Sequence, residues 1–200
     1  MFKDAEIPKP QEKDKSVFDW NSHQANYNKL SATEKEFYYW VNYSRTNPVK
    51  FFNEVIIPII TVYPQLKGEN LESLKKDLYN VQPLPMMRLN DTLLGMSRQH
   101  ANDITSNNSK PSHNSTNGTT FVDRFKANNL KNCGGENISY GAGETDPLFM
   151  LILLYLDLNV SDLGHRKALL NSNYSNTGIA INHYGNGNTF LVEDFACNQN

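Results

Sequence analysis

The chain has 200 residues, of which 38% are hydrophobic and 20% charged, and its formal net charge is -2 at pH 7. Length and composition of this kind predict one globular domain whose core is large enough to fold without metals or multiple disulfides. The slightly acidic balance argues against the basic surface that nucleic acid or anionic lipid would require. The longest apolar run, residues 148–156, is far shorter than the roughly 20 residues that cross a membrane.

Residues 1–30 are polar and lack sustained hydrophobic periodicity, so we expect an N-terminal tail followed by a single domain over residues 31–200. The N-terminal residues contain no apolar stretch of the kind found in a signal peptide, which indicates either a cytosolic protein or a mature chain without its leader. Cys133 and Cys197 have neither metal-binding nor redox spacing. A disulfide and two free thiols therefore both stay open.

Helical periodicity dominates the first half of the expected domain. Residues 34–47 predict a helix capped by Ser31 or Thr33, and a second short helix is expected from Pro48 to Pro58. Residues 61–85 are polar with a modest helical pattern, and they are interpreted as an insertion or connector. Residues 92–105 predict an amphipathic helix that Asn90 or Asp91 caps.

The second half mixes loops, helices and strands. Residues 106–117 are rich in turn-forming residues, and residues 119–129 predict a short helix. The glycine-rich residues 133–143 favour a tight turn with a short extended piece. Residues 148–158 are apolar on every side, which indicates a helix inside the core. Two alternating segments, residues 177–184 and 188–196, predict a hairpin, so we expect helices flanking a small antiparallel sheet.

The five histidines differ in where they lie along these elements. His23 in the tail, His100 on the apolar stripe of its helix and His183 in a strand are expected to be structural. His113 and His165 lie in a loop and at the end of an element, where proteins commonly carry functional groups. These two histidines are therefore candidates for a site.

Two carboxylates accompany these histidines. Glu136 lies between Gly135 and Asn137, where it could either serve a site or accept hydrogen bonds from nearby backbone N–H groups. Asp157 ends the apolar helix and faces the Gly164-His165 step. The motifs of zinc peptidases, of serine hydrolases, of P-loop proteins and of dinucleotide-binding proteins are all missing from the sequence.

The order of several short motifs resembles the CAP superfamily, which comprises cysteine-rich secretory, antigen 5 and pathogenesis-related 1 proteins (the SCP-like domain). The motifs are H-x4-G-x5-R from His113 to Arg124, G-E-N-I from Gly135 to Ile138, and Gly164-His165-Arg166. The resemblance covers roughly residues 30–198. The G-H-R version and the few cysteines resemble the bacterial branch. The resemblance implies an α+β fold, an α-β-α sandwich with a small antiparallel sheet, in an extracellular or cell-surface protein.

The resemblance also implies an open cleft lined by a tetrad of two histidines and two acids, here His113, Glu136, Asp157 and His165. Asp157 stands where the family often has a glutamate three residues after a tryptophan, and its carboxylate reaches about one methylene less far. Two imidazoles beside carboxylates suit Zn²⁺ or a similar divalent cation. We therefore predict that His113 and His165 bind metal, weakly, because two protein nitrogens make an incomplete site.

Three functions fit these residues. The first is a secreted, monomeric binding module whose cleft takes a small ligand, a lipid or sterol, or a peptide. The second is a metal-dependent hydrolase in which Glu136 activates a water and His165 polarises a carbonyl. The third is an interaction scaffold without catalysis. We expect the binding module rather than an enzyme, because no motif fixes a Ser or Cys nucleophile beside either histidine and a catalytic zinc normally has three protein ligands.

Two further segments bear on the ligand. Residues 51–60 carry many aliphatic and aromatic side chains, which would either form a lipid groove or, as we expect, pack in the domain. Arg166 and Lys167 could reach an anionic ligand, although solvation at the surface is the expectation. A disulfide between the two cysteines would tie the segment carrying Glu136 to the edge of the sheet.

Overall fold

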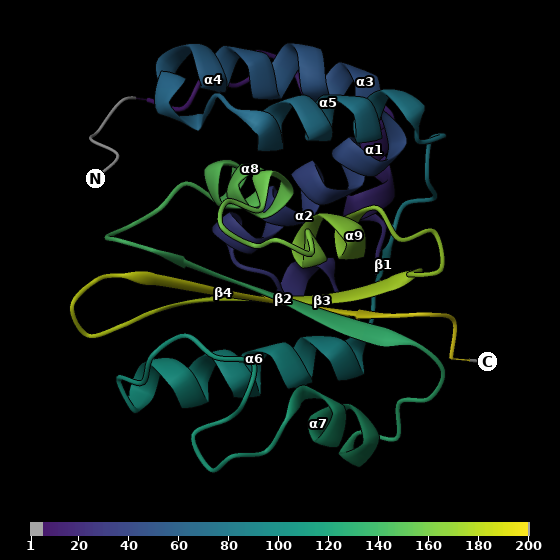
Figure 1. The fold of residues 1–200 in the computed structure, drawn as a ribbon. Helices are drawn as coiled ribbons and strands as arrows, with labels where there is room; N and C mark the ends of the chain where they lie inside the picture. Colours follow the sequence, from purple (N-terminus) through teal and green to yellow (C-terminus); the bar gives the residue numbers. More distant parts are fainter. Residues whose placement is uncertain (1–5, 200) are drawn as a thin grey trace.

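A computed structural model describes residues 6–199, so the first five residues of the expected tail and Asn200 lie outside the description. One mixed sheet of four strands forms the middle layer (Figure 1). Its strands lie in the order β1 (Arg88–Leu89), β3 (Asn176–His183), β4 (Thr189–Ala196) and β2 (Gly134–Gly141). The short β1 is parallel to β3, and the other pairs are antiparallel.

Helices cover both faces of this sheet (Figure 1). One face carries α6 (Asp91–Ser106) and α7 (Phe121–Ala127), and the opposite face carries α2 (Ala32–Thr46), α8 (Pro147–Leu156) and α9 (Gly164–Leu169). Beyond α2 and α8 lies an outer layer that includes α3 (Pro48–Lys50), η2 (Phe51–Ile56), α4 (Ile57–Val62) and α5 (Glu69–Asn80). The expected α+β class and α-β-α sandwich are confirmed.

The predicted hairpin forms from β3 and β4, and every residue of β4 is buried. Close approach of α6 to this hairpin depends on Gly178, because a Cβ atom there would overlap the backbone of Leu93. The glycine-rich segment before α8 differs from its prediction. It forms the eight-residue strand β2, since pairing along the whole of β4 satisfies its backbone groups.

The apolar helix predicted near residue 150 is α8, and it lies in the core. The Asp146 side chain accepts hydrogen bonds from the backbone N–H groups of Leu148 and Phe149, and Pro147 occupies the first turn. The helix ends at Asp157, which adopts the left-handed conformation with φ of 53°. The chain turns there toward the start of α9.

The segment expected as a polar tail contains the helix α1 (Lys15–Ser22) and the short η1 (Tyr27–Lys29). The side chain of Val17 is fully buried, and the Asn42 amide on α2 donates to the Asn21 amide oxygen over 2.8 Å. Part of the expected tail is therefore packed against the domain. Its apolar contacts are too few per turn to give a hydrophobic period in the sequence.

The second helical segment does not stop before Pro58, as the sequence predicted. The backbone N–H of Ile57 donates to the carbonyl of Phe52, five residues back, so the chain widens into a π-type turn just before the proline. Such a turn lets a helix continue past a residue that lacks an N–H group. The apolar side chains around it are buried in the main core as expected, including Phe51, Phe52, Val55, Ile56, Ile59 and Ile60.

The segment interpreted as a connector, residues 61–85, includes the short η3 (Pro64–Leu66) and the twelve-residue helix α5. Leu71, Leu74 and Leu78 of α5 are buried in the core. The helix contacts α8 and supplies polar groups to the site region. No helix among residues 6–199 combines the length and the hydropathy that a membrane span needs.

Candidate functional site

An open cleft of about 410 Å³ lies at the edge strand β2, between the loop that precedes α7 and the helix α9. Three of the four residues in the expected tetrad line it, namely His113, Glu136 and His165. The fourth, Asp157, is 1% exposed and lies behind His165. The other lining residues are Gly135, Asn137, Val160, Asp162, Gly164, Lys167, Ala168, Asn171 and Tyr174.

The His113 imidazole is held by Glu136. His113 Nδ1 lies 2.8 Å from Glu136 Oε1, and the second carboxylate oxygen of Glu136 accepts a hydrogen bond from Arg124. Arg124 also donates to the His113 carbonyl over 2.9 Å, so one guanidinium fixes both the acid and the loop. Because an ionised carboxylate only accepts hydrogen bonds, the neutral His113 ring carries its proton on Nδ1 and presents Nε2 as an acceptor.

Glu136 is an ionised, buried acid. Burial acts to raise its pKa, but the hydrogen bond from His113 and the charge of Arg124 outweigh burial, so the pKa of Glu136 is lowered. Its side chain is 1% exposed, while the His113 side chain is 50% exposed. The carboxylate therefore binds the imidazole from its buried side, and the imidazole itself stays exposed to solvent.

Asp157 holds His165 in the same way. One oxygen of Asp157 binds His165 Nδ1, and the other accepts the backbone N–H of Arg166 over 3.0 Å. The left-handed backbone of Asp157 directs its side chain toward the first turn of α9. As at His113, this contact places the proton on Nδ1 and leaves Nε2 of His165 for a ligand.

Arg166 is buried, which corrects the expectation of a solvated surface residue. Its guanidinium donates to Ser73 Oγ over 2.9 Å, to Asp77 over 3.0 Å and to the carbonyl of Tyr155 over 2.7 Å. These bonds hold α9 between α5 and the end of α8. Only the neighbouring Lys167 lines the cleft.

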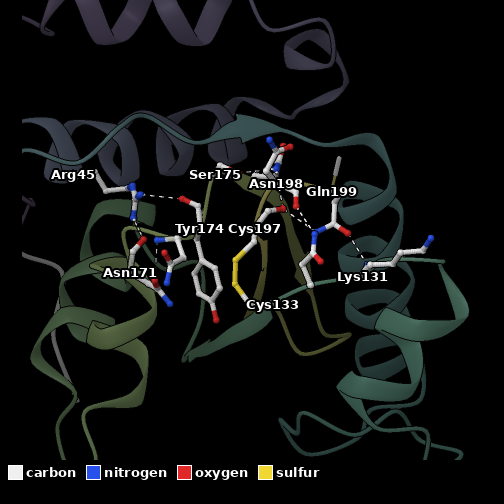
Figure 2. Close-up of a disulfide and its surroundings, with 12 residues drawn as sticks. Arg45, Lys131, Cys133, Asn171, Tyr174, Ser175, Cys197, Asn198 and Gln199 are labelled. Atoms are coloured by element: carbon white, nitrogen blue, oxygen red, sulfur yellow. Dashed lines mark hydrogen bonds between the residues drawn. A yellow bond between two sulfur atoms is a disulfide. The ribbon is translucent and has the colours of Figure 1, made fainter.

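A disulfide joins Cys133 and Cys197 beside the cleft, with a Cα–Cα distance of 5.3 Å. Figure 2 shows it next to the ring of Tyr174, which lines the cleft and stacks on Phe195 with ring centroids 5.3 Å apart. The disulfide links the residues before β2 to those after β4. It thus decides the question left open by the spacing of the cysteines.

The remaining histidines lie away from the cleft lining. His100 is 1% exposed, and its Nε2 lies 2.8 Å from the carbonyl of Ser112. Burial lowers the pKa of His100. His23 and His183 are exposed at the ends of α1 and β3.

The sequence interpretation missed two buried acids in β4, Glu193 and Asp194, both 0% exposed. Burial raises the pKa of Glu193 to about 8 and that of Asp194 well above its usual range. Asp194 lies directly opposite Glu136 in the sheet. Two consecutive acids inside an apolar strand were the visible indication, because alternation alone would place at least one of them in the core.

The residues that could hold a metal at the cleft are the two imidazoles. Among residues 6–199 no group of three or more histidine, cysteine, aspartate or glutamate side chains is arranged to hold a metal ion. The two carboxylates of the tetrad are already bound to Nδ1 atoms. A cation at the cleft would therefore have two protein nitrogens at most and would take its other ligands from water or from a bound molecule.

Residues 79–195, more than half of the chain, match the family described as CAP, the cysteine-rich secretory protein family. The chain belongs to this family. The CAP match spans the cleft, including the His113, Glu136 and His165 positions that line it. A search of curated proteins finds no match.

Solved structures similar to this CAP chain include two bacterial proteins and one from a parasitic worm. An outer surface protein from Borrelia burgdorferi has 20% identity and a TM-score of 0.46, over 68% of this chain and 88% of that one. An extracellular protein containing a SCP domain from Bacillus anthracis has 23% identity and a TM-score of 0.43, over 69% of this chain and 43% of that one. Venom allergen-like protein 4 from Schistosoma mansoni has 14% identity and a TM-score of 0.48, over 84% of this chain and 90% of that one.

Proposed function

We propose that this CAP protein is an exported binding module whose cleft takes a small molecule or peptide beside a reversibly bound divalent cation. The observation that carries the proposal is the matched pair of imidazoles. Each of His113 and His165 lines the same cleft and has its Nδ1 engaged by a carboxylate, which directs Nε2 to the ligand. Carboxylate-supported imidazoles of this kind are typical neighbours of bound zinc.

Export is supported by the disulfide and by the family. Disulfides persist in oxidising compartments and are rare in the cytosol, so the Cys133–Cys197 pair favours a protein that acts outside the cytoplasm. The family is described as secretory. Mass spectrometry of the native protein with and without reductant tests the pairing, and two free thiols in the protein as isolated would contradict it.

Hydrolysis with Glu136 as general base has less support. Both oxygens of this carboxylate accept strong hydrogen bonds, and its lowered pKa makes it a weaker base. The cleft lining offers amide, hydroxyl and ammonium groups from Asn137, Tyr174 and Lys167. These groups suit recognition of a polar ligand by hydrogen bonds.

Calorimetric titration with zinc tests the metal part of the proposal. The wild type is expected to take up zinc, and the double variant His113→Ala, His165→Ala is expected to lose that uptake. The control double variant His23→Ala, His183→Ala removes the same number of imidazoles from exposed positions away from the cleft lining, and it should bind as the wild type does. Equal uptake by the wild type and the His113, His165 variant would overturn the proposal.

A further inference from the structure

Two buried carboxyl groups lie side by side beneath the cleft. Glu136 of β2 and Asp194 of β4 are partners in the antiparallel register, so their side chains are on the same face of the sheet. Asp194 is 0% exposed, and the Glu136 side chain is 1% exposed. Neither group can be stabilised by bulk water, so each must be stabilised by its protein neighbours.

The hydrogen bonds around Asp194 leave one of its oxygens without a donor. Ser97 on α6 donates its hydroxyl to Asp194 Oδ2 over 2.7 Å. Asp194 Oδ1 has no donor among the described residues, and the carboxylate of Glu136 interacts with Asp194 from across the strand pair. Two facing acceptors repel one another unless a proton lies between them.

The charges around the pair decide which acid holds this proton. Arg124 binds Glu136 directly, and His113 donates to the same carboxylate, so Glu136 keeps its negative charge. The hydrogen-bond donor to Asp194 is the neutral hydroxyl of Ser97. His100 on α6 is buried, and burial lowers its pKa, which favours the uncharged form of its ring. Burial and the adjacent charge of Glu136 both raise the pKa of Asp194.

We propose that Asp194 is a positioning residue of the cleft: as a neutral carboxylic acid it donates its proton in a hydrogen bond to Glu136, and so fixes the carboxylate that holds His113. Glu136 has lone pairs to spare for this third hydrogen bond, because each oxygen of a carboxylate can accept two. The arrangement forms a chain from Ser97 through Asp194 and Glu136 to the imidazole. It concerns the site of the proposed function but does not depend on metal or ligand binding.

The protonation of Asp194 is measured directly by carbon NMR of protein labelled with ¹³C at the aspartate carboxyl groups. At neutral pH we expect one carboxyl signal at the position of a protonated acid, and we expect it to vanish in Asp194→Asn. Labelling aspartate alone excludes Glu193, the other buried acid of β4. If every aspartate carboxyl is ionised at neutral pH in the wild type, the proposal is wrong.

The positioning role is tested by the ¹⁵N signals of the His113 imidazole in metal-free protein. The variant Asp194→Asn keeps an N–H donor on a side chain of the same shape, so the Nδ1–H signal should stay where the wild type has it. Asp194→Leu removes the donor, and that signal should move or be lost. Glu193→Gln is the matched control, because consecutive strand residues face opposite sides of the sheet and Glu193 contacts Thr177 instead.

Two outcomes would overturn the positioning role. One is an unchanged His113 signal in folded Asp194→Leu, and the other is a displacement in Asp194→Asn as large as in Asp194→Leu. Thermal unfolding shows which variants fold. Should Asp194→Leu fail to fold, the smaller variant Asp194→Ala, which also lacks a donor, takes its place in both comparisons, and the carboxyl signal of the wild type still tests the protonation of Asp194. Because no metal is added, failure here is distinct from failure of zinc binding.

Discussion

Asp157 binds the imidazole of His165 from the buried side, and its second oxygen accepts the backbone N–H of the next residue, Arg166. One carboxylate therefore fixes both the ring and the first turn of α9. Replacement by Asn tests this double role. Asn tolerates the left-handed backbone at this position, so the turn is kept, but an NH2 group that cannot accept replaces one of the two carboxylate oxygens, so one of the two donors loses its acceptor.

For Asp157→Asn we expect zinc affinity to fall by about 10- to 100-fold, as is usual when a carboxylate behind a ligating histidine is lost. Calorimetry measures the affinity, and ¹⁵N NMR of His165 shows whether the Nδ1–H tautomer is lost with it. Asp19→Asn, at an exposed acid of α1, is the control. An unchanged tautomer in Asp157→Asn would show that Asp157 does not orient the ring.

Arg124 neutralises the buried charge of Glu136, so its removal should destabilise the fold. Breaking a buried ion pair by removing one partner costs about 3 kcal/mol, and Arg124→Gln is expected to lower the free energy of unfolding by roughly that amount. Urea unfolding measures the loss. Arg98→Gln is the control, because the Arg98 side chain is 40% exposed and its ion pair with Glu34 is long, at 3.7 Å. Equal stability of Arg124→Gln and the wild type would contradict this ion pair.

The ion pair between Arg124 and Glu136 also predicts how the unfolding free energy depends on pH. The pKa of Glu136 is lowered in the folded state, so its contribution to stability is present above its ordinary pKa of 4.5 and is lost as the pH falls through the folded pKa. In Arg124→Gln that contribution is already reduced. The difference in unfolding free energy between wild type and variant should therefore shrink in acid, and a difference that stays constant down to about pH 2 would count against this account.

Glu193 makes the stability of the fold depend on pH in the opposite direction. Its pKa is raised to about 8, chiefly by burial, so the folded protein holds a proton that the unfolded chain releases above its ordinary pKa of 4.5. Stability should fall between these two values as the pH rises. Glu193→Gln should show a smaller fall, while the exposed Glu72→Gln should follow the wild type. Urea unfolding across this range measures the slopes, and parallel slopes for Glu193→Gln and wild type would refute the assignment.

The absence of a side chain at Gly178 allows α6, the helix that carries Ser97, to pack closely against the sheet. A Cβ atom there would overlap the backbone of Leu93, so Gly178→Ala must displace α6 from the sheet. We expect a loss of about 1–3 kcal/mol in unfolding free energy. Gly95→Ala, on α6 with nothing within 4 Å of its Cβ position, should instead stabilise the protein by about 0.5–1 kcal/mol. Equal thermal stability of the two variants would contradict this close packing.

The sequence predicts the parts of the fold that depend on local pattern. The amphipathic α6, the apolar α8 and the β3–β4 hairpin follow from periodicity, and Asn90 caps α6 through the backbone N–H of Leu93. The motif order also singled out His113, Glu136 and His165, which line one cleft. Such features need only neighbours in the chain, which is why one sequence suffices.

The parts that the sequence did not predict depend on partners far along the chain. Arg166 is buried because Ser73 and Asp77, 93 and 89 residues away, accept its hydrogen bonds. Asp194 acquires its environment from Ser97, 97 residues away, and from the strand opposite. No local pattern marks Arg166 as buried, and the two adjacent acids of β4 indicate only that one of them faces the core, because burial by distant elements is a tertiary effect.

The Cys133–Cys197 bond encloses a stretch of chain that contains three of the four tetrad residues, Glu136, Asp157 and His165, and leaves His113 outside. A single proteolytic cut between the two cysteines, for example in the exposed turn at residues 185–187, would leave both fragments covalently attached. With the disulfide intact, the two fragments of the cleaved chain would stay close to each other and could pack together again. Under reducing conditions only the non-covalent contacts of β4 would hold the C-terminal piece after the same cut, so the bond makes resistance to proteolysis depend on the surroundings of the protein.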